Sequence, residues 1–324
     1  PFAASIAGAA PLGDVRTRVS ADRREVVIET APLHVPEAVS YSHHPSEERL
    51  EFAWPVDGWV HGYQIDLVDA AGRPLARTLL HHAGVANLGR RQLAYPTAER
   101  LFAVGRETRP VALPDSMGVP LVAGERLLLY FALVNETATP VDDARLRVRL
   151  NVVPRGEGRR PQDVFPLVLD ANPQPIAGGS RAFDVPPGLS ATSSEFRLPM
   201  GGHLRAMGAH LHDHAVEIRL EDVLTGRVLA RLATQRDAAG RLISVDDTRF
   251  LLKRRGQRLD AGRPYRVVAV YDNPTAETIR HGAMAYLAGP FVPDDAARWP
   301  ALDASSPDYQ RDLSVADAHA GHIR

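Results

Sequence analysis

The feature that most constrains the fold of this chain is the frequency of short runs rich in β-forming residues, separated by Gly, Pro, Asn and Asp. Few windows carry apolar residues at helical spacing. Short runs of this kind, bounded by turn-forming residues, are typical of strands. They occur at 25–29, 59–68, 75–82, 126–134, 145–153, 164–169, 203–214, 216–222, 228–232, 266–271 and 283–291. The sequence therefore predicts an all-β fold of sandwiches or jelly rolls.

The length of the chain indicates two such units. Its 324 residues exceed a typical single domain. A polar stretch containing Gly and Pro, from Pro154 to Asp163, follows a completed strand-like run. Domain boundaries fall in segments of this composition. We expect two tandem jelly-roll-like β-sandwich domains, residues 1–155 and 156–324.

Composition excludes several classes of function. With a net charge of -1, the chain carries no electrostatic footprint for nucleic acid or an anionic membrane. No apolar run reaches the roughly 18 residues of a membrane span. Because there are no cysteines, thiolate zinc sites, catalytic cysteine and disulfides are excluded. The segment Pro1–Ala10 resembles the remnant of a removed leader, which favours a secreted or periplasmic location.

Three histidines at alternate positions, His210, His212 and His214, form the clearest candidate for a functional site. On a strand, every second side chain leaves the same face, about 6.6 Å from the last. One metal ion could take all three imidazoles, which suit zinc, copper, iron or nickel. The alternative is a half-buried strand whose histidines face solvent while Ala209 and Leu211 face the core.

A second histidine pair, His81 and His82, ends the run 75–82. Adjacent side chains of a regular strand point to opposite faces, so both reach one metal only at a bulge or strand end. Between the runs 60–68 and 75–82, Gly72 can supply the positive φ that a tight turn requires. Paired as a hairpin, these runs would place His61 opposite His82 or His81, depending on the length of the loop.

The order of these features resembles the copper type II ascorbate-dependent monooxygenases, the family of peptidylglycine α-hydroxylating monooxygenase and dopamine β-monooxygenase. Thr78–His82 is similar to the family's first-copper histidine pair, and Ala209–His212 is similar to the H-x-H of its second copper. Met284 falls where the family has a methionine ligand, and a thioether favours copper over zinc. The resemblance spans 51–293. It implies two jelly-roll-like domains with one copper on each, facing across a water-filled cleft, and an external electron donor.

Two departures from the family pattern bear on what the site does. Asn135 stands where the third histidine of the first copper is expected, and an amide is a poor copper ligand beside imidazoles. His61 is the candidate replacement. Gly208 stands where the peptide-acting members carry an arginine for the substrate carboxylate, so the resemblance does not extend to a peptidyl-glycine substrate.

The sequence thus leaves three hypotheses. The first is a copper-dependent monooxygenase or other oxidoreductase with a mononuclear site at His210, His212 and Met284, and with His214 as a further candidate ligand. The second is a non-catalytic, secreted copper-binding or scavenging module on the same fold. The third is a structural or interaction protein with incidental histidines. The substrate, whether a small molecule or a peptide, is not identified by these residues.

Overall fold

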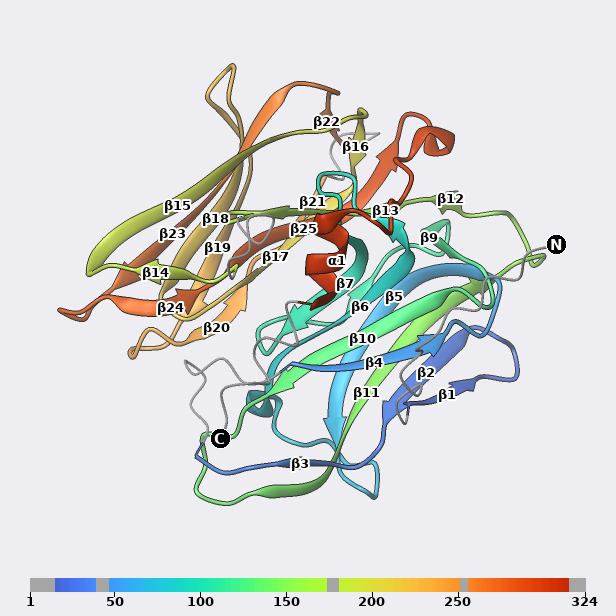
Figure 1. The fold of residues 1–324 in the computed structure, drawn as a ribbon, viewed down its shortest axis with the longest axis horizontal. Helices are drawn as coiled ribbons and strands as arrows, with labels where there is room; N and C mark the ends of the chain where they lie inside the picture. The colour runs from blue at the N-terminus through green and yellow to red at the C-terminus, as the bar shows by residue number, and fades with distance from the viewer. Residues whose placement is uncertain (1–14, 39–46, 174–180, 251–255, 315–324) are drawn as a thin grey trace.

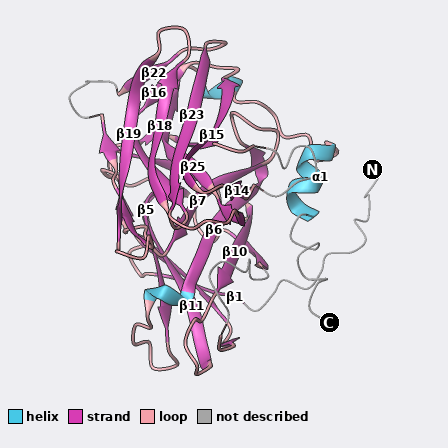
Figure 2. Ribbon diagram, turned by 90° about the vertical axis from the view of Figure 1, so that its left-hand side faces the viewer, coloured by secondary structure: helices cyan, strands magenta, loops and turns pink. Residues whose placement is uncertain are grey.

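Strands make up more than half of the described chain and form two β-sandwiches that lie side by side (Figure 1). The computed structural model describes residues 15–38, 47–173, 181–250 and 256–314, so the leader-like segment 1–10 lies outside the described residues. The helix α1 (Pro307–Ser314) lies against the first sandwich, where it contacts β7 (Ala98–Gly105). Figure 2 shows strands filling the molecule and α1 at one side. The all-β prediction is confirmed.

The first sandwich consists of a larger and a smaller sheet. The larger sheet has the order β1 (Val15–Val19), β2 (Glu25–Thr30), β11 (Val141–Pro154), β5 (Gly58–Val68), β9 (Met117–Leu121) and β12 (Gln162–Asp163), with β3 (Leu33–Val35) beside β11 and β8 (Val111–Ala112) beside β5. The smaller sheet has the order β4 (Glu48–Ala53), β10 (Arg126–Leu133), β6 (Leu80–Arg91) and β7.

The second sandwich also consists of two main sheets. One sheet has the order β21 (Thr248–Arg249), β17 (Ala206–Leu211), β25 (Ala285–Pro293), β16 (Gly202–Leu204) and β22 (Gln257–Leu259), with β13 (Phe165–Asp170) also beside β25. The other has the order β15 (Gly188–Arg197), β23 (Pro264–Asn273), β18 (Ala215–Asp222), β19 (Arg227–Arg236) and β20 (Leu242–Val245), and β14 (Phe183–Val185) pairs with β24 (Ile279–Ala283). The short 3-10 turns are η1 (Arg77–Leu79) and η3 (Ala296–Arg298). The chain changes sandwich between β12 and β13, whereas the sequence analysis divided it at residue 155.

Each sandwich encloses its own apolar core, and β11 shows how the sequence produces it. Leu146, Val148 and Leu150 are buried in the first core, and the residues between them are arginines. Side chains of a strand alternate between its two faces, so this period of two buries one face and leaves the charged face at the surface. A separate set of buried side chains, which includes Leu211, Leu220 and Phe291, forms the second core.

The predicted turn at Gly72 is present, but the predicted hairpin is wrong. Gly72 has a φ of 78°, and the amide of Leu75 donates to the carbonyl of Leu67 at 2.8 Å. Beyond this point the chain leaves β5 through η1 and enters the other sheet as β6. The side chain of Arg77 donates to the carbonyl of Ile65 at 2.9 Å and to that of Thr108 at 2.6 Å, which holds the crossover in place. Strand β5 pairs with β8, β9 and β11 instead.

Each sandwich contains a turn of the same kind, and this turn explains why an asparagine stands at position 135. The side-chain oxygen of Asn135 accepts from the amide and hydroxyl of Thr137, while its nitrogen donates to two backbone carbonyls. Asn273, at the end of β23, makes the same four contacts, with Thr275 in the place of Thr137. Both asparagines are almost fully buried. Asn135 therefore fills a structural position in a repeated turn, and its amide does not replace a histidine ligand.

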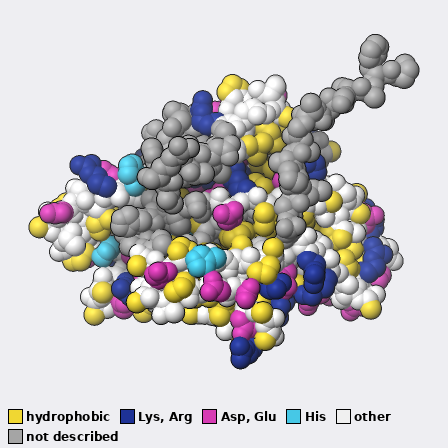
Figure 3. Space-filling model, turned by 60° about the horizontal axis from the view of Figure 1, so that its bottom comes forward, with side chains coloured by type: hydrophobic (Ala, Val, Ile, Leu, Met, Phe, Trp, Pro, Cys, Tyr) yellow, Lys and Arg dark blue, Asp and Glu magenta, His cyan; other side chains and the backbone are white. Residues whose placement is uncertain are grey.

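The surface and helices add two observations. On the face drawn in Figure 3, acidic and basic side chains lie among one another. Within the described ranges, no helix is long and apolar enough to cross a membrane.

Candidate metal centre

His210 lies on β17 and His212 directly follows that strand, and both rings are turned toward the first sandwich. On the opposite face, Met207 and Leu211 belong to the second core. His210 and His212 are only 2% and 3% exposed. Of the three imidazoles predicted to share a face, those of His210 and His212 have ring centres 5.3 Å apart, and both are enclosed by the other sandwich and do not face solvent.

The histidine pair of the first sandwich sits at a β-bulge. In the pairing of β10 with β6, Ala132 is opposite His82 and Leu133 is opposite Leu80, so His81 is the extra residue. A bulge turns neighbouring side chains toward one another. The Nδ1 atoms of His81 and His82 lie 2.9 Å apart. This is the geometry in which the sequence analysis expected adjacent histidines to act together.

The two histidine pairs meet where the sandwiches face each other. The ring centres of His81 and His212 are 5.5 Å apart, and those of His210 and His212 are 5.3 Å apart. The resemblance implied one metal site on each domain, separated by a cleft. In this fold the crossover after β5 brings His81 to the seam between the sandwiches, beside His212.

Hydrogen bonds to Nδ1 set the tautomers of the histidines from the second sandwich. His210 Nδ1–H donates to Oε1 of Glu107 at 2.8 Å, and His212 Nδ1–H donates to the carbonyl of Gly282 at 3.3 Å. In these tautomers Nε2 carries the lone pair. A metal-bound histidine usually donates its other ring N–H to a carboxylate or carbonyl in this manner.

His81 is linked to a partly buried carboxylate, that of Glu47, through His82. The pKa of Glu47 is raised by burial, but the hydrogen bond from His82 and the charges of His82 and Arg49 lower it to about 2, so this carboxylate is ionised at neutral pH. It accepts from His82 Nε2–H at 2.9 Å. The Nδ1 atoms of His81 and His82 share a hydrogen bond, which links His81 to this carboxylate through His82.

These features suit a metal bound by three imidazoles. Metal–nitrogen bonds of about 2 Å around a tetrahedral ion place ring centres roughly 5 Å apart, close to the spacings observed here. Nε2 of His210 is buried and has no hydrogen-bond partner within the described chain. Among the described residues, however, no three His, Asp or Glu side chains already surround one point as ligands. The rings would have to shift to converge on one ion.

Met284 and His214 have different relations to this cluster. Leu211 with Ala285 is the last pair of the ladder between β17 and β25, and His212 and Met284 are the residues just beyond that pair. Strand β17 ends at Leu211, and His214 lies in the following turn with a φ of 68°, its ring against Gly240. The predicted continuous strand through His214 is wrong.

His61 lies apart from the histidine pair of its own sandwich. It is the extra residue of a bulge between β5 and β11, and its Nδ1–H donates to the carbonyl of Leu113 at 3.1 Å. The proposed hairpin neighbour of His81 and His82 is therefore held against a different segment, because β5 and β6 belong to different sheets.

Sequence reasoning missed the carboxylate that orients His210. Asp213, within the histidine run, does not take this role, because its Oδ1 accepts from Arg106 at 2.5 Å and from the amide of Leu242 at 2.7 Å. The residue next to Arg106, Glu107, bonds His210. Glu107 follows β7, far from any histidine in the chain and in no spacing motif, so no sequence signal marked it.

Comparisons with known proteins bear on the fold alone. No family model and no curated protein matches the chain. The STIV MCP aligns with 86% of this chain and 99% of its own at 10% identity and a TM-score of 0.39. For a structure of Sulfolobus Turreted Icosahedral Virus the coverages are 95% and 99%, again at 10% identity and a TM-score of 0.39. For PNGF-II they are 88% and 62%, at 10% identity and a TM-score of 0.30. Such low TM-scores transfer no function, and the resemblance to copper monooxygenases stays a prediction.

Proposed function

We propose that this protein binds one copper ion between its two β-sandwiches, with His81, His210 and His212 as ligands. The observation that carries the proposal is the meeting of three buried imidazoles from both sandwiches, each with Nδ1 engaged in a hydrogen bond. Met284 lies just beyond the end of the same ladder as His212, and as a fourth ligand its thioether would favour copper over zinc. A bound copper would supply dioxygen binding and activation, as in the family that the sequence resembles.

The surrounding residues prepare the site for such an ion. Glu107 holds the ring of His210 from behind, and Glu47 holds His81 through His82. Enclosure by both sandwiches keeps water from the imidazoles, which are almost fully buried. Fixed rings and a dry surrounding lower the cost of organising ligands when the ion binds.

A second candidate function is the non-catalytic copper-binding module. It is favoured by the lack of a separate site for electron delivery within the described part of the first sandwich. His82 is bonded to Glu47, Asn135 is used in a turn, and His61 lies elsewhere. Without a second copper, the two-copper scheme of the resembling family has no counterpart here.

Metal titration tests the shared site. Cu(I) and Cu(II) are titrated into metal-free protein and into its His81→Ala and His212→Ala variants. The control is His34→Ala, because His34 is an exposed histidine that is paired with Asp142. We expect each of the first two substitutions to weaken binding by at least about tenfold, and His34→Ala to leave it unchanged. Unchanged affinity in His81→Ala would overturn the site shared by both sandwiches.

Oxygen consumption separates the two candidate functions. Copper-loaded protein is supplied with ascorbate as the electron donor and compared with the His210→Ala variant under the same conditions. Oxygen uptake that depends on His210 supports the oxidoreductase. Tight copper binding without such uptake supports the non-catalytic module.

A further inference from the structure

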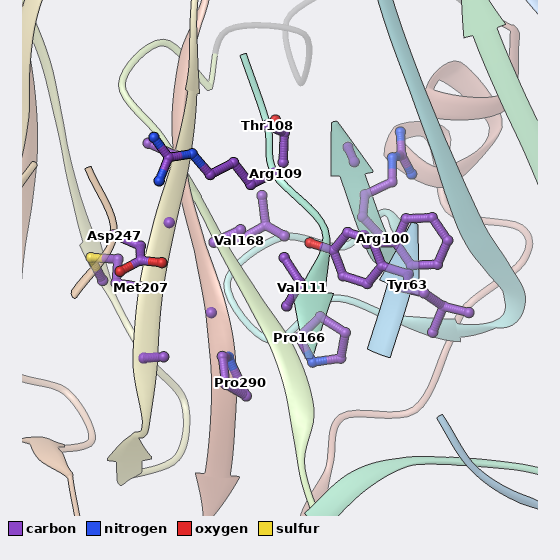
Figure 4. A pocket seen from close by; sticks show the side chains of 18 of the residues that line it. Tyr63, Arg100, Thr108, Arg109, Val111, Pro166, Val168, Met207, Asp247 and Pro290 are labelled. Atoms are coloured by element: carbon purple, nitrogen blue, oxygen red, sulfur yellow. The ribbon is translucent and has the colours of Figure 1, made fainter. Parts of the chain in front are cut away.

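A cavity of about 410 Å³ lies between the two sandwiches, and its lining comes from both. Figure 4 shows part of this lining, with Tyr63 and Arg100 on one side and Met207 and Asp247 on the other. The volume is within the usual range of small-molecule sites, about 300–1,000 Å³. Valines, leucines and prolines make up much of the wall, which suits an apolar molecule.

Small residues hollow the wall that the second sandwich contributes. Gly208, Ala288 and Val168 lie opposite one another on β17, β25 and β13, and all three line the cavity. A Cβ at Gly208 would meet no atom within 4 Å, so the missing side chain leaves open space. Two residues along the same strands, His210 lies opposite Tyr286, with ring centres 5.3 Å apart. Tyr286 therefore stands between the cavity, which it lines, and the candidate metal centre.

A fixed phenol projects from the wall that the first sandwich contributes. Tyr63 of β5 stacks on Phe102 of β7, with ring centres 4.2 Å apart and ring planes 13° from parallel. These strands belong to different sheets, and Phe102 is part of the first core, so the stacked pair spans the sandwich. Figure 4 shows the hydroxyl oxygen of Tyr63 pointing into the cavity. The ring is held from behind, and its polar end is presented to whatever occupies the space.

The hydroxyls of Tyr63 and Tyr286 are unused within the described chain. Neither oxygen forms a hydrogen bond with a described residue, and neither is fully enclosed by protein. Burial raises the pKa of both phenols well above the usual value, so both keep their proton at neutral pH. A tyrosine hydroxyl in largely buried surroundings usually has a hydrogen-bond partner. The two phenols therefore offer a donor from each side of the cavity.

The charged groups of the lining disfavour a charged ligand. Arg100 donates to both carboxylate oxygens of Asp312, at 2.6 and 2.8 Å, and Arg181 lies 3.5 Å from the same carboxylate. Arg109 and Asp247 are exposed, so water already solvates both. A neutral molecule fits these surroundings better than an ion, because burying an ion without a partner is costly.

We propose that this cavity binds a small, neutral and largely apolar molecule that carries a carbonyl group, to which the hydroxyls of Tyr63 and Tyr286 donate. A carbonyl oxygen has two lone pairs and can accept from both phenols. The inference deepens the proposed function and rests on it for one point, that the bound molecule would lie beside the copper. The binding itself needs no metal, since the chain makes every contact named.

Two probes of the same shape test the role of the carbonyl. Binding of 2-acetylnaphthalene and of 2-isopropenylnaphthalene, in which a methylene group replaces the carbonyl oxygen, is measured by equilibrium dialysis against protein kept metal-free with a chelator. The readout is the preference for the ketone, which is the ratio of the two affinities. We expect the unsubstituted protein to bind the ketone, and absence of binding would overturn the proposal.

Variants that remove only a hydroxyl show whether the phenols make the contact. In the double variant Tyr63→Phe and Tyr286→Phe, the preference for the ketone should fall at least about fivefold, because two hydrogen bonds are lost. Tyr265→Phe is the matched control, since the hydroxyl of Tyr265 accepts from the amide of Asp260 away from the cavity, and it should keep the preference. An unchanged preference in the double variant would overturn the proposal.

Cavity-filling variants test the location. Gly208→Leu should weaken binding of the ketone by at least about tenfold, and Ala288→Leu, on the paired strand, is the second variant if the first does not fold. Leu189→Ser, at a 74% exposed position on β15, is the control that should bind normally. Unchanged binding in a folded cavity-filling variant would overturn the location.

Metal binding and probe binding are measured on the same preparations, which keeps the two proposals separate. If the ketone binds as expected but copper does not bind, only the proposed function fails. If copper binds but the ketone does not, only the cavity proposal fails.

Discussion

Nδ1 of His210 in the second sandwich lies 2.8 Å from Oε1 of Glu107 in the first. The contact joins the two halves and orients one imidazole of the candidate site. The neighbouring pair, Arg106 and Asp213, crosses the same seam at 2.5 Å. The segment after β7 therefore positions the site and also holds the sandwiches together.

Replacing Glu107 with leucine should weaken copper binding about 10–100-fold, because carboxylates that hold ligand histidines contribute on this scale. Competition with a chelator of known affinity measures the change. Glu195→Leu, which removes an exposed carboxylate paired with Arg266, is the matched control. Equal affinities for both variants would show that the Glu107 contact does not serve a metal site.

Copper should stabilise the fold as a whole, since its ligands come from both sandwiches. At a free concentration a hundred times the Kd, a ligand that binds only the native state adds about 2.7 kcal/mol. Thermal unfolding with and without copper should show a higher Tm that a chelator reverses. The His81→Ala variant should show a clearly smaller shift at the same copper concentration, and a full shift in that variant would exclude His81 as a ligand.

Asn135→Ala and Asn273→Ala should have equal effects, because each amide makes the same four contacts in its turn. We expect each substitution to lower the free energy of unfolding by about 2–3 kcal/mol and to leave copper affinity unchanged. Urea unfolding and metal titration provide the two readouts. A selective loss of copper binding in Asn135→Ala would restore this residue as a ligand.

Glu99 should make stability depend on pH. Burial raises its pKa to about 7, from an ordinary value of 4.5, although Arg90 opposes the shift. Between these two values the folded protein holds a proton that the unfolded chain has lost, so stability falls as pH rises across this window. The loss amounts to at most about 3 kcal/mol.

Urea unfolding at pH 5 and pH 8 measures this dependence. Glu99→Gln should flatten it, whereas Glu51→Gln, at a carboxylate that is 40% exposed, should not. An unchanged pH dependence in Glu99→Gln would assign the effect to another group.

Strands with a clear alternation were predictable from sequence, and those without it were not. The alternation of aliphatic residues and arginines in β11 marks a strand with one buried face. Strand β15 lies at the edge of its sheet, and its central run of Ser, Ala and Thr has no buried residue, so it gives little periodic signal. The hairpin between 60–68 and 75–82 failed because local turn chemistry does not specify which sheet a strand enters next.

The sequence by itself determined the all-β class and the positions of many strands, and it put His210 and His212 on one face, because local periodicity decides which side chains share a face. Only the tertiary structure decided that His81 meets His212 and that Glu107 supports His210. Those contacts depend on how one sandwich faces the other and on the crossover that carries the chain from β5 into β6. Such long-range contacts produce no periodic pattern in the residues that flank His81 or Glu107 in the sequence.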